Sequence, residues 1–240
     1  MKILIVQLSD MHCKSQDGEY SLKIRKAAVA LKTLGPVQSA VVIFSGDLTN
    51  SASKNEFKAG KKILKGFLSE LQTEIGCKRI PLLIVPGNHD MFLPDGCRDF
   101  DEILTWNKDE HLDEELDRLS KFFEYAHSQG CFTDGSNLYH VKTIEINGVK
   151  IQACLLNSAP YSTRKPNDKQ IHYFPPYVIE KISRDPSAHL KFSIMHHSYE
   201  WCEWTTKEML KKVFPKMTLF SLDMIIWQKR CLSVMGMATI

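Results

Sequence analysis

The stretch 82-LLIVPGNHDM-91 decides how the rest of the sequence is interpreted. Four apolar residues, Leu82–Val85, lead directly into the sequence Pro-Gly-Asn-His-Asp of residues 86–90. A buried strand that ends in a Gly-containing turn would present an amide, an imidazole and a carboxylate at one end of a sheet. These groups bind metal ions or transfer protons, so the stretch predicts a functional site that needs partners from other strands.

The composition is that of a globular protein. Of the 240 residues, 43% are hydrophobic and 25% are charged, which predicts one domain with a buried core and at most a small appendage. The net charge of +3 is too small to indicate a nucleic-acid partner by itself. The lysines at 58, 61, 62 and 65 have helical spacing and are interpreted as a solvated helix face rather than a binding patch.

The cysteines and the N-terminus indicate the compartment. Seven scattered cysteines with no C-x-x-C pair favour reduced thiols over a disulfide framework or a zinc knot. The apolar run Ile3–Val6 is too short for a secretory signal. No stretch approaches the roughly 20 apolar residues that span a bilayer. We therefore expect a cytoplasmic protein without membrane insertion, and the sequence leaves its oligomeric state open.

Strands and helices alternate in the first half of the chain. Short apolar runs predict buried strands, and apolar residues spaced near 3.6 predict helices. In chain order these elements are the strand Ile3–Leu8, the helix Tyr20–Leu34, the strand Ala40–Phe44, the helix Lys54–Ile75 and the strand Pro81–Val85. The alternation predicts an α/β fold with a parallel sheet covered on both faces.

The second half is predicted to be more antiparallel, because Asn147-Gly148 between two alternating runs is a hairpin signal. The segments Asp95–Asp109 and Ser162–Pro176 are predicted to be irregular. The other predicted elements are a helix over Leu112–Ala126, strands at Leu138–Ile146, Val149–Leu156, Leu190–His196 and Ser221–Trp227, and a helix over Thr205–Phe214. Nothing in the composition marks a linker between domains.

Polar side chains follow four of the predicted strands. They are Asp10 and His12, then Gly46-Asp47, then residues 87–90, and finally His196-His197. Ligands of α/β sheets bind beyond the carboxyl ends of the strands, so these groups are predicted to converge. Each motif alone has a structural explanation, such as a helix cap or a turn. Four in succession favour a site.

The residue types indicate metal chemistry. Carboxylates, an amide oxygen and imidazoles are ligands for manganese, iron or zinc, and a carboxylate such as Asp47 can bridge two ions. Two ions about 3.5–4 Å apart can hold a phosphate ester and lower the pKa of a shared water. A centre of this kind can hydrolyse a phosphoester at neutral pH.

The set of motifs resembles the calcineurin-like metallophosphoesterase family, whose signature is D-x-H, G-D, G-N-H-D, a late H and G-H-x-H. The first four stand here at residues 10–12, 46–47, 87–90 and 196, and the resemblance covers residues 3 to about 226. It implies a layered β-sandwich flanked by helices over residues 1–226. The remaining residues, 227–240, form an atypical tail, and we expect the fold to lack its C-terminal strands.

The resemblance also implies two divalent metal ions, Mn, Fe or Zn, as cofactors. Asp10 and His12 would hold the first ion, and Asp47 would bridge. Asn88 and His196 would hold the second ion. The substrate would be a phosphoester, either a small molecule or a nucleic acid.

Two further residues have implied catalytic roles. His89 would reach the phosphate, where it stabilises developing charge or protonates the leaving oxygen. Asp90 would hold the His89 imidazole in one tautomer. His197 is the less favoured member of its pair as a metal ligand.

The chain departs from the family at the last motif. Trp227–Arg230 stands where G-H-x-H is expected, and no histidine follows His197. Three explanations remain open: a truncated or frame-altered product, an active variant with other ligands, and a non-catalytic scaffold that binds proteins. The first is favoured because the predicted strand before the missing motif is placed as the family requires.

Overall fold

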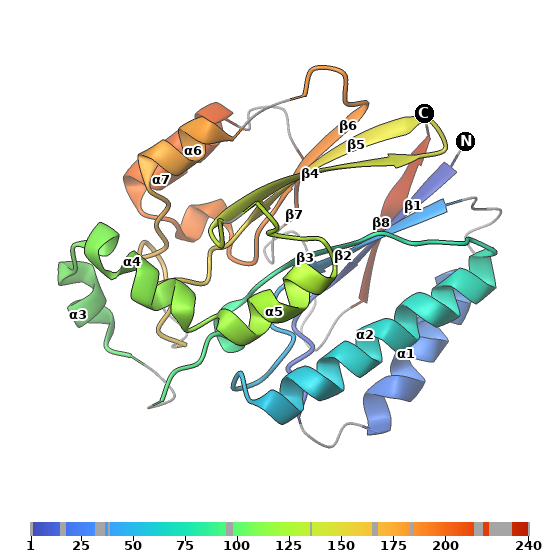
Figure 1. The fold of residues 1–240 in the computed structure, drawn as a ribbon, viewed down its shortest axis with the longest axis horizontal. Coiled ribbons are helices and arrows are strands. Elements are labelled where there is room, and N and C mark those ends of the chain that lie inside the picture. Colours follow the sequence, from blue (N-terminus) through green and yellow to red (C-terminus); the bar gives the residue numbers. More distant parts are fainter. Residues whose placement is uncertain are drawn as a thin grey trace.

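Two four-stranded sheets lie face to face in the computed structural model of the chain, with helices on the outside (Figure 1). The described residues are 2–14, 18–31, 37, 39–94, 98–134, 136–164, 168–182, 185–213, 218–220 and 232–239. One hydrophobic core contains buried side chains from both sheets, among them Val42 and Ile151. The predicted α/β sandwich flanked by helices is confirmed.

The first sheet comes mainly from the N-terminal third. In spatial order its strands are β3 (Leu82–Val85), β2 (Ser39–Ser45), β1 (Lys2–Leu8) and β8 (Leu232–Thr239). The pairs β1–β2 and β2–β3 are parallel, as the alternation of strands and helices predicts. Parallel pairing sends all three carboxyl ends toward the same edge of the sheet.

Two helices cover the outer face of this sheet, and the second sheet covers its inner face (Figure 1). They are α1 (Gly18–Leu31) and α2 (Lys54–Ile75). The bounds of α2 agree with the prediction because local signals set both ends. A capping box of Ser53 and Glu56 starts the helix, and Gly76 ends it with φ 68°.

The second sheet mixes parallel and antiparallel pairs. In spatial order its strands are β4 (Tyr139–Ile146), β5 (Val149–Leu156), β6 (Leu190–Ile194) and β7 (Thr218–Phe220). Asn147 and Gly148 join β4 to antiparallel β5 with positive φ at both positions, as the hairpin signal predicts. The pairs β5–β6 and β6–β7 are parallel, so this half is less antiparallel than expected.

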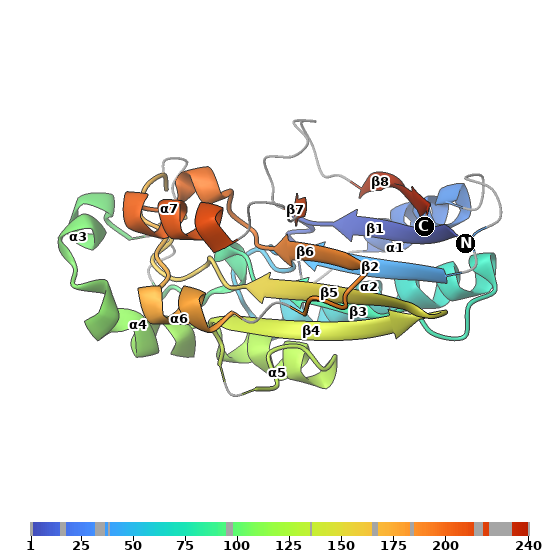
Figure 2. The same cartoon turned by 90° about the horizontal axis from the view of Figure 1, so that it is seen from above.

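The remaining helices gather at one end of the sandwich and along one side. They are α3 (Phe100–Thr105), α4 (Lys108–Asp117), α5 (Ser120–Ser128), α6 (Pro176–Lys181) and α7 (Trp204–Val213), with short 3-10 turns at Asn88–Asp90 (η2) and Tyr199–Trp201 (η3). Figure 2 shows β1, β5 and β6 pointing toward the end where α6 and α7 lie.

Two local predictions in this region are wrong. The segment predicted to be irregular contains α3, which Asp99 caps by accepting from two backbone amides. The single helix predicted over Leu112–Ala126 is broken at Leu119, where the chain leaves α4 and starts α5.

The C-terminal segment differs from the expectation where it is described. The tail was expected to add no strand, but Leu232–Thr239 forms β8 and pairs antiparallel with β1. A parallel sheet that ended at β1 would leave a row of unpaired backbone groups there, and β8 satisfies them. The predicted strand Ser221–Trp227 and the departure at Trp227–Arg230 lie outside the described residues. Within the described part of the chain, the helices are too short or too polar to cross a bilayer.

Candidate metal centre

The loops that follow β1 and β2 run side by side beyond the end of the sheet. The backbone amides of Asp10, His12 and Cys13 each donate a hydrogen bond of 3.0 Å to a carbonyl of the second loop. The acceptors are the carbonyls of Gly46, Asp47 and Leu48. The loops thus continue the parallel pairing of the strands, and this pairing brings the D-x-H and G-D motifs together.

Asp47 occupies the middle of the cluster. Its Oδ2 lies 3.5 Å from Nε2 of His12 and 3.5 Å from Nε2 of His196. Its Oδ1 accepts a 2.8 Å hydrogen bond from the backbone amide of His89. One buried carboxylate therefore contacts groups that follow three other strands, in both sheets.

His196 is held from both ring nitrogens. Its Nδ1 lies 2.8 Å from the carbonyl oxygen of Ser45, which can only accept, so Nδ1 carries a proton. Its Nε2 faces Oδ1 of Asn88 at 3.1 Å. The ring is thus oriented with Nε2 toward Asn88 and Asp47, the arrangement that a metal-binding imidazole requires.

The electrostatics of the cluster favour a cation beside Asp47. Burial alone would raise the Asp47 pKa, but the imidazoles of His196, His89 and His12 together outweigh burial and lower it to about 2. Burial alone would lower the His196 pKa, yet Asp47 raises it to about 9. Burial lowers the pKa of His12, which keeps that imidazole neutral and available as a ligand.

The donor atoms form two groups that share Asp47. His12, Asp47 and His89 form one group, and Asp10, Asp47 and His196 form the other, with ligand atoms within 4.8 Å of one another in each. Two ligands at tetrahedral angles on a metal ion lie about 3.4 Å apart, from metal–ligand distances near 2.1 Å. The 3.5 Å separations on either side of Asp47 fit that spacing.

The grouping differs from the predicted division of ligands. Asp10 and His12 were expected to share one ion, but these groups place Asp10 with His196 and His12 with His89. Asp10 Oδ1 is also 3.8 Å from His12 Nε2, so Asp10 lies close to both groups. His197 belongs to neither group, and its Nδ1 faces the carbonyl oxygen of Ser158 at 3.0 Å.

The expected contact between Asp90 and the His89 imidazole is wrong. Nδ1 of His89 instead faces the carbonyl oxygen of Asn50 at 2.8 Å. The Asp90 carboxylate accepts hydrogen bonds from the backbone amides of Leu48, Thr49 and Gly87. The turn η2 directs the Asp90 side chain back into the loops, where it pairs amides that would otherwise be buried without partners. Burial first, and then Asp47, raises the pKa of Asp90 to about 6.

Two glycines allow the loops to approach each other. A Cβ on Gly87 would lie 2.2 Å from Oδ1 of Asp47, and a Cβ on Gly46 would lie 2.6 Å from Nδ1 of His196. Gly46 also has φ 101°. The glycines of G-D and G-N-H-D are therefore required by contact with the ligands, in addition to turn geometry.

The sequence did not single out Arg164. Its guanidinium donates to the backbone carbonyls of Asn88, His89 and Met91, and so clamps the loop that carries two candidate site residues. Burial lowers the pKa of Arg164, while the carboxylates of Asp47 and Asp90 oppose that shift. Arg164 lies in a segment that has neither a motif nor a periodic pattern, so its position was accessible only from the structure.

The comparison with protein families agrees with the fold and the cluster. The chain matches the family model of the calcineurin-like phosphoesterases over residues 3–208. The chain therefore belongs to the calcineurin-like phosphoesterase family. Members of this family typically depend on divalent metal ions, and the structure contains candidate ligand groups for them.

Individual relatives and solved structures have low sequence identity to the chain. A probable glycerophosphodiester phosphodiesterase of Arcobacter nitrofigilis is 28% identical over 116 residues, which are 46% of this chain and 38% of that protein. The phosphopantetheinyl hydrolase of Mycobacterium tuberculosis has 13% identity and a TM-score of 0.43, over 88% of this chain and 79% of that one. The 5'-nucleotidase of Candida albicans has 15% identity and a TM-score of 0.43, over 91% and 41%.

Proposed function

We propose that the chain hydrolyses phosphoesters at a dinuclear metal centre, with phosphodiesters as the first substrates to test. The proposed metal ligands are Asp10, His12, Asp47, Asn88 and His196. The observation that carries the proposal is the position of the Asp47 carboxylate between the imidazoles of His12 and His196. The scaffold alternative is not favoured, because the described residues contain both ligand groups.

Bound divalent ions would supply activation of water and neutralisation of the phosphate charge. The chain's own residues would orient the substrate and move protons. Because Nδ1–H of His89 donates to the Asn50 carbonyl, the atom left for the substrate is Nε2. Neutral His89 can only accept there, so protonation of a leaving oxygen requires the imidazolium form. The ring centroids of His89 and His12 are 4.5 Å apart, which places His89 beside the proposed ligands.

Other features support narrower choices. Similarity to the Arcobacter protein, a probable glycerophosphodiester phosphodiesterase, favours a phosphodiester substrate. Mixed oxygen and nitrogen donors suit manganese, iron or zinc, and manganese is the first ion to test. The scattered cysteines of the sequence favour a cytoplasmic location.

The test removes the shared carboxylate. The purified protein is stripped with a chelator, reloaded with manganese, and assayed for bound metal and for hydrolysis of bis-p-nitrophenyl phosphate. We expect two ions per chain and turnover, and Asp47→Asn should lose both. Asp134→Asn is a matched control, because Asp134 also contacts a histidine, His140, at 3.2 Å but lies outside the cluster. Equal metal content and activity in wild type and Asp47→Asn would refute the proposal.

A further inference from the structure

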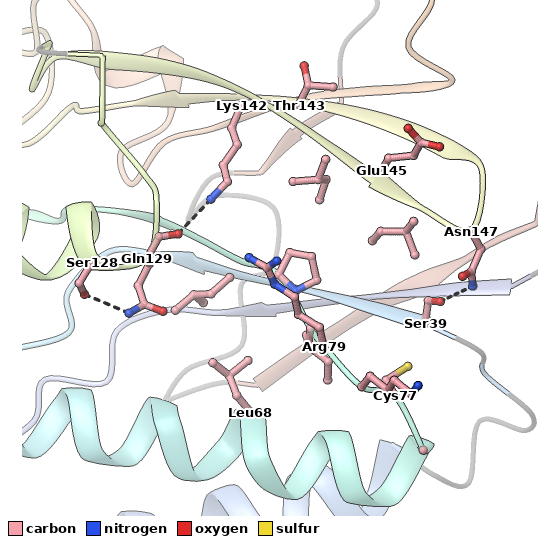
Figure 3. A pocket seen from close by; sticks show the side chains of 17 residues that line it. Ser39, Leu68, Cys77, Arg79, Ser128, Gln129, Lys142, Thr143, Glu145 and Asn147 are labelled. Atoms are coloured by element: carbon pink, nitrogen blue, oxygen red, sulfur yellow. Dashed lines mark hydrogen bonds between the residues drawn. The ribbon is translucent and has the colours of Figure 1, made fainter.

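A groove opens between the two sheets (Figure 3). It lies at the start of β2 and β3, which is the end opposite the candidate metal centre. Its volume is about 790 Å³. We call it the edge groove; 17 residues line it, chiefly Ser39 at the start of β2, residues 76–82 before and in β3, and residues 142–147 of β4 and its turn. The metal-centre residues follow the carboxyl ends of β1, β2, β3 and β6, so the edge groove is a separate place on the molecule.

The groove lies beside the edge strands of the two sheets. β3 is the last strand of the first sheet, and β4 is the last strand of the second. Figures 1 and 2 show both strands on the same side of the sandwich, with α5 alongside. The helix covers part of this side, and the edge groove begins beyond its C-terminal end, at Ser128 and Gln129.

Hydrogen bonds close both ends of the gap. At one end Lys142 Nζ donates to the Gln129 carbonyl at 3.0 Å. At the other end Asn147 Nδ2 donates to Ser39 Oγ at 2.6 Å. Residues 143–146 of β4 lie between these bridges and span roughly 13 Å at the usual rise per strand residue. The opening therefore matches about four residues of an extended chain.

The lining exposes the backbone of the edge as well as one face. Six consecutive residues, 142–147, line the groove on one wall, and seven consecutive residues, 76–82, line the other. Side chains of a strand alternate between two faces, so a cavity that meets every residue of a strand runs along its edge. Such an edge presents unpaired amide and carbonyl groups, which a second extended chain can satisfy.

The charged residues that line the edge groove favour an acidic partner. Lys78, Arg79 and Lys142 are cationic, whereas Glu145 is the one carboxylate among the lining residues. Lys78 and Arg79 are exposed, and Arg79 lies between the two closed ends (Figure 3). Apolar lining from Ile144, Ile146 and Pro81 would receive alternate side chains of an extended peptide. A segment that alternates acidic and aliphatic residues complements this groove.

We propose that the edge groove docks an extended acidic peptide segment of a partner protein, whose backbone pairs with the free edge of β4. The aliphatic side chains pack toward the apolar lining, and the carboxylates face Arg79 and the two lysines. This surface is independent of the proposed hydrolysis, because it uses none of the metal-centre residues.

The test uses a fluorescein-labelled hexapeptide that alternates glutamate and valine, titrated with the full chain and followed by fluorescence anisotropy. Saturable binding is expected, and Arg79→Glu should weaken it by about tenfold or more, because like charges then meet in the groove. Lys65→Glu, on the exposed face of α2, makes the same charge change elsewhere and should leave the affinity within about twofold. Hydrolytic activity and circular dichroism confirm that each variant is folded.

Two further probes decide between a strand and a simple anion. The same peptide with an N-methyl group on every backbone amide keeps its charge but has no amide left for strand pairing, and it should lose binding. Inorganic phosphate at ionic strength matched with sodium chloride should not compete. Undiminished binding of the methylated peptide, competition by phosphate, or no binding of the parent peptide would each overturn the proposal.

Discussion

His196 Nε2 and Asn88 Oδ1 lie 3.1 Å apart although 108 residues separate them in the chain. Asn88 follows β3 in the first sheet, whereas His196 follows β6 in the second. The candidate metal centre therefore exists only when the two sheets are packed together. A ligand that binds the folded state alone raises its stability by mass action, so metal binding should be coupled to folding.

Manganese should accordingly raise the melting temperature of the chelator-treated protein. At a hundredfold excess over Kd the gain is about 2.7 kcal/mol, which corresponds to about 5–10 °C for a chain of this size. Asn88→Ala should lose most of the shift, and differential scanning fluorimetry measures it. Asn107→Ala, a change of the same type before α4, should keep the shift. An unchanged response in Asn88→Ala would remove Asn88 from the ligand set.

Gly87→Ala should damage the site through contact with Asp47. The added Cβ would lie 2.2 Å from Oδ1 and 2.5 Å from the backbone nitrogen of Asp47, so one loop must move. We expect a loss of about 1–3 kcal/mol in the free energy of unfolding, the usual cost of overpacking, and a fall in activity. Urea denaturation and the phosphodiester assay report the two effects.

Gly66→Ala is the matched control, because nothing lies within 4 Å of its Cβ position in α2. That variant should be more stable by up to about 1 kcal/mol, since alanine favours a helix over glycine. If Gly87→Ala behaves like Gly66→Ala, the close approach of the two loops is not required.

Arg164 is expected to act as a positioning residue, since it contacts the loop of Asn88 and His89 through backbone carbonyls. Arg164→Ala should lower kcat by about tenfold or more with a smaller effect on KM, because a loosened loop misplaces its side chains. Arg164→Lys should recover only part of the loss, since one ammonium cannot copy the planar guanidinium. Arg25→Ala, at an exposed residue of α1, serves as the control. A loss confined to stability, with kcat per folded molecule unchanged, would contradict this role.

His172 should make stability depend on pH. It is fully buried and stacked on His197 with ring centroids 3.8 Å apart, and burial lowers its pKa from 6.5 to about 3. The unfolded chain binds the proton more readily than the folded chain, so the contribution is fully present above pH 6.5. It is lost as the pH falls from 6.5 toward 3, with a slope of about 1.4 kcal/mol per pH unit.

Urea denaturation of the metal-free protein between pH 7 and pH 4.5 measures this slope. His172→Phe keeps a stacked ring without a titrating group, so its slope should be smaller. His111→Phe, at a partly exposed histidine beside Trp106, controls for the loss of a histidine. Equal slopes in wild type and His172→Phe would exclude the buried imidazole as the cause.

Local signals explain which elements were predictable. The bounds of α2 follow from Ser53, Glu56 and Gly76 together with a regular apolar face, all within one short segment. The break at Leu119 and the short helix α3 lie in an acidic region with few apolar residues, where periodicity is weak. The strand β8 depends on the free edge of β1, which is distant in sequence.

The candidate site was predictable because its side chains directly follow strands that the sequence predicts. The sequence could not reveal which groups hold them. His89 is oriented by the carbonyl of Asn50, and the loop of Asn88 is clamped by Arg164 through carbonyl oxygens. Every residue has a backbone carbonyl, so a contact made through one leaves no pattern of residue types in the sequence. The wrong pairing of Asp90 with His89 arose because adjacent residues in a tight turn point in different directions.

The backbone at Asp10, His12 and Asp47 has positive φ values of 53°, 42° and 59°. Side chains in this left-handed region carry a conformational cost that glycine avoids. A laboratory evolution campaign that rewards heat resistance alone would therefore enrich glycine at these three positions. The selected variants would be more stable but inactive, so such a campaign needs a parallel screen for turnover.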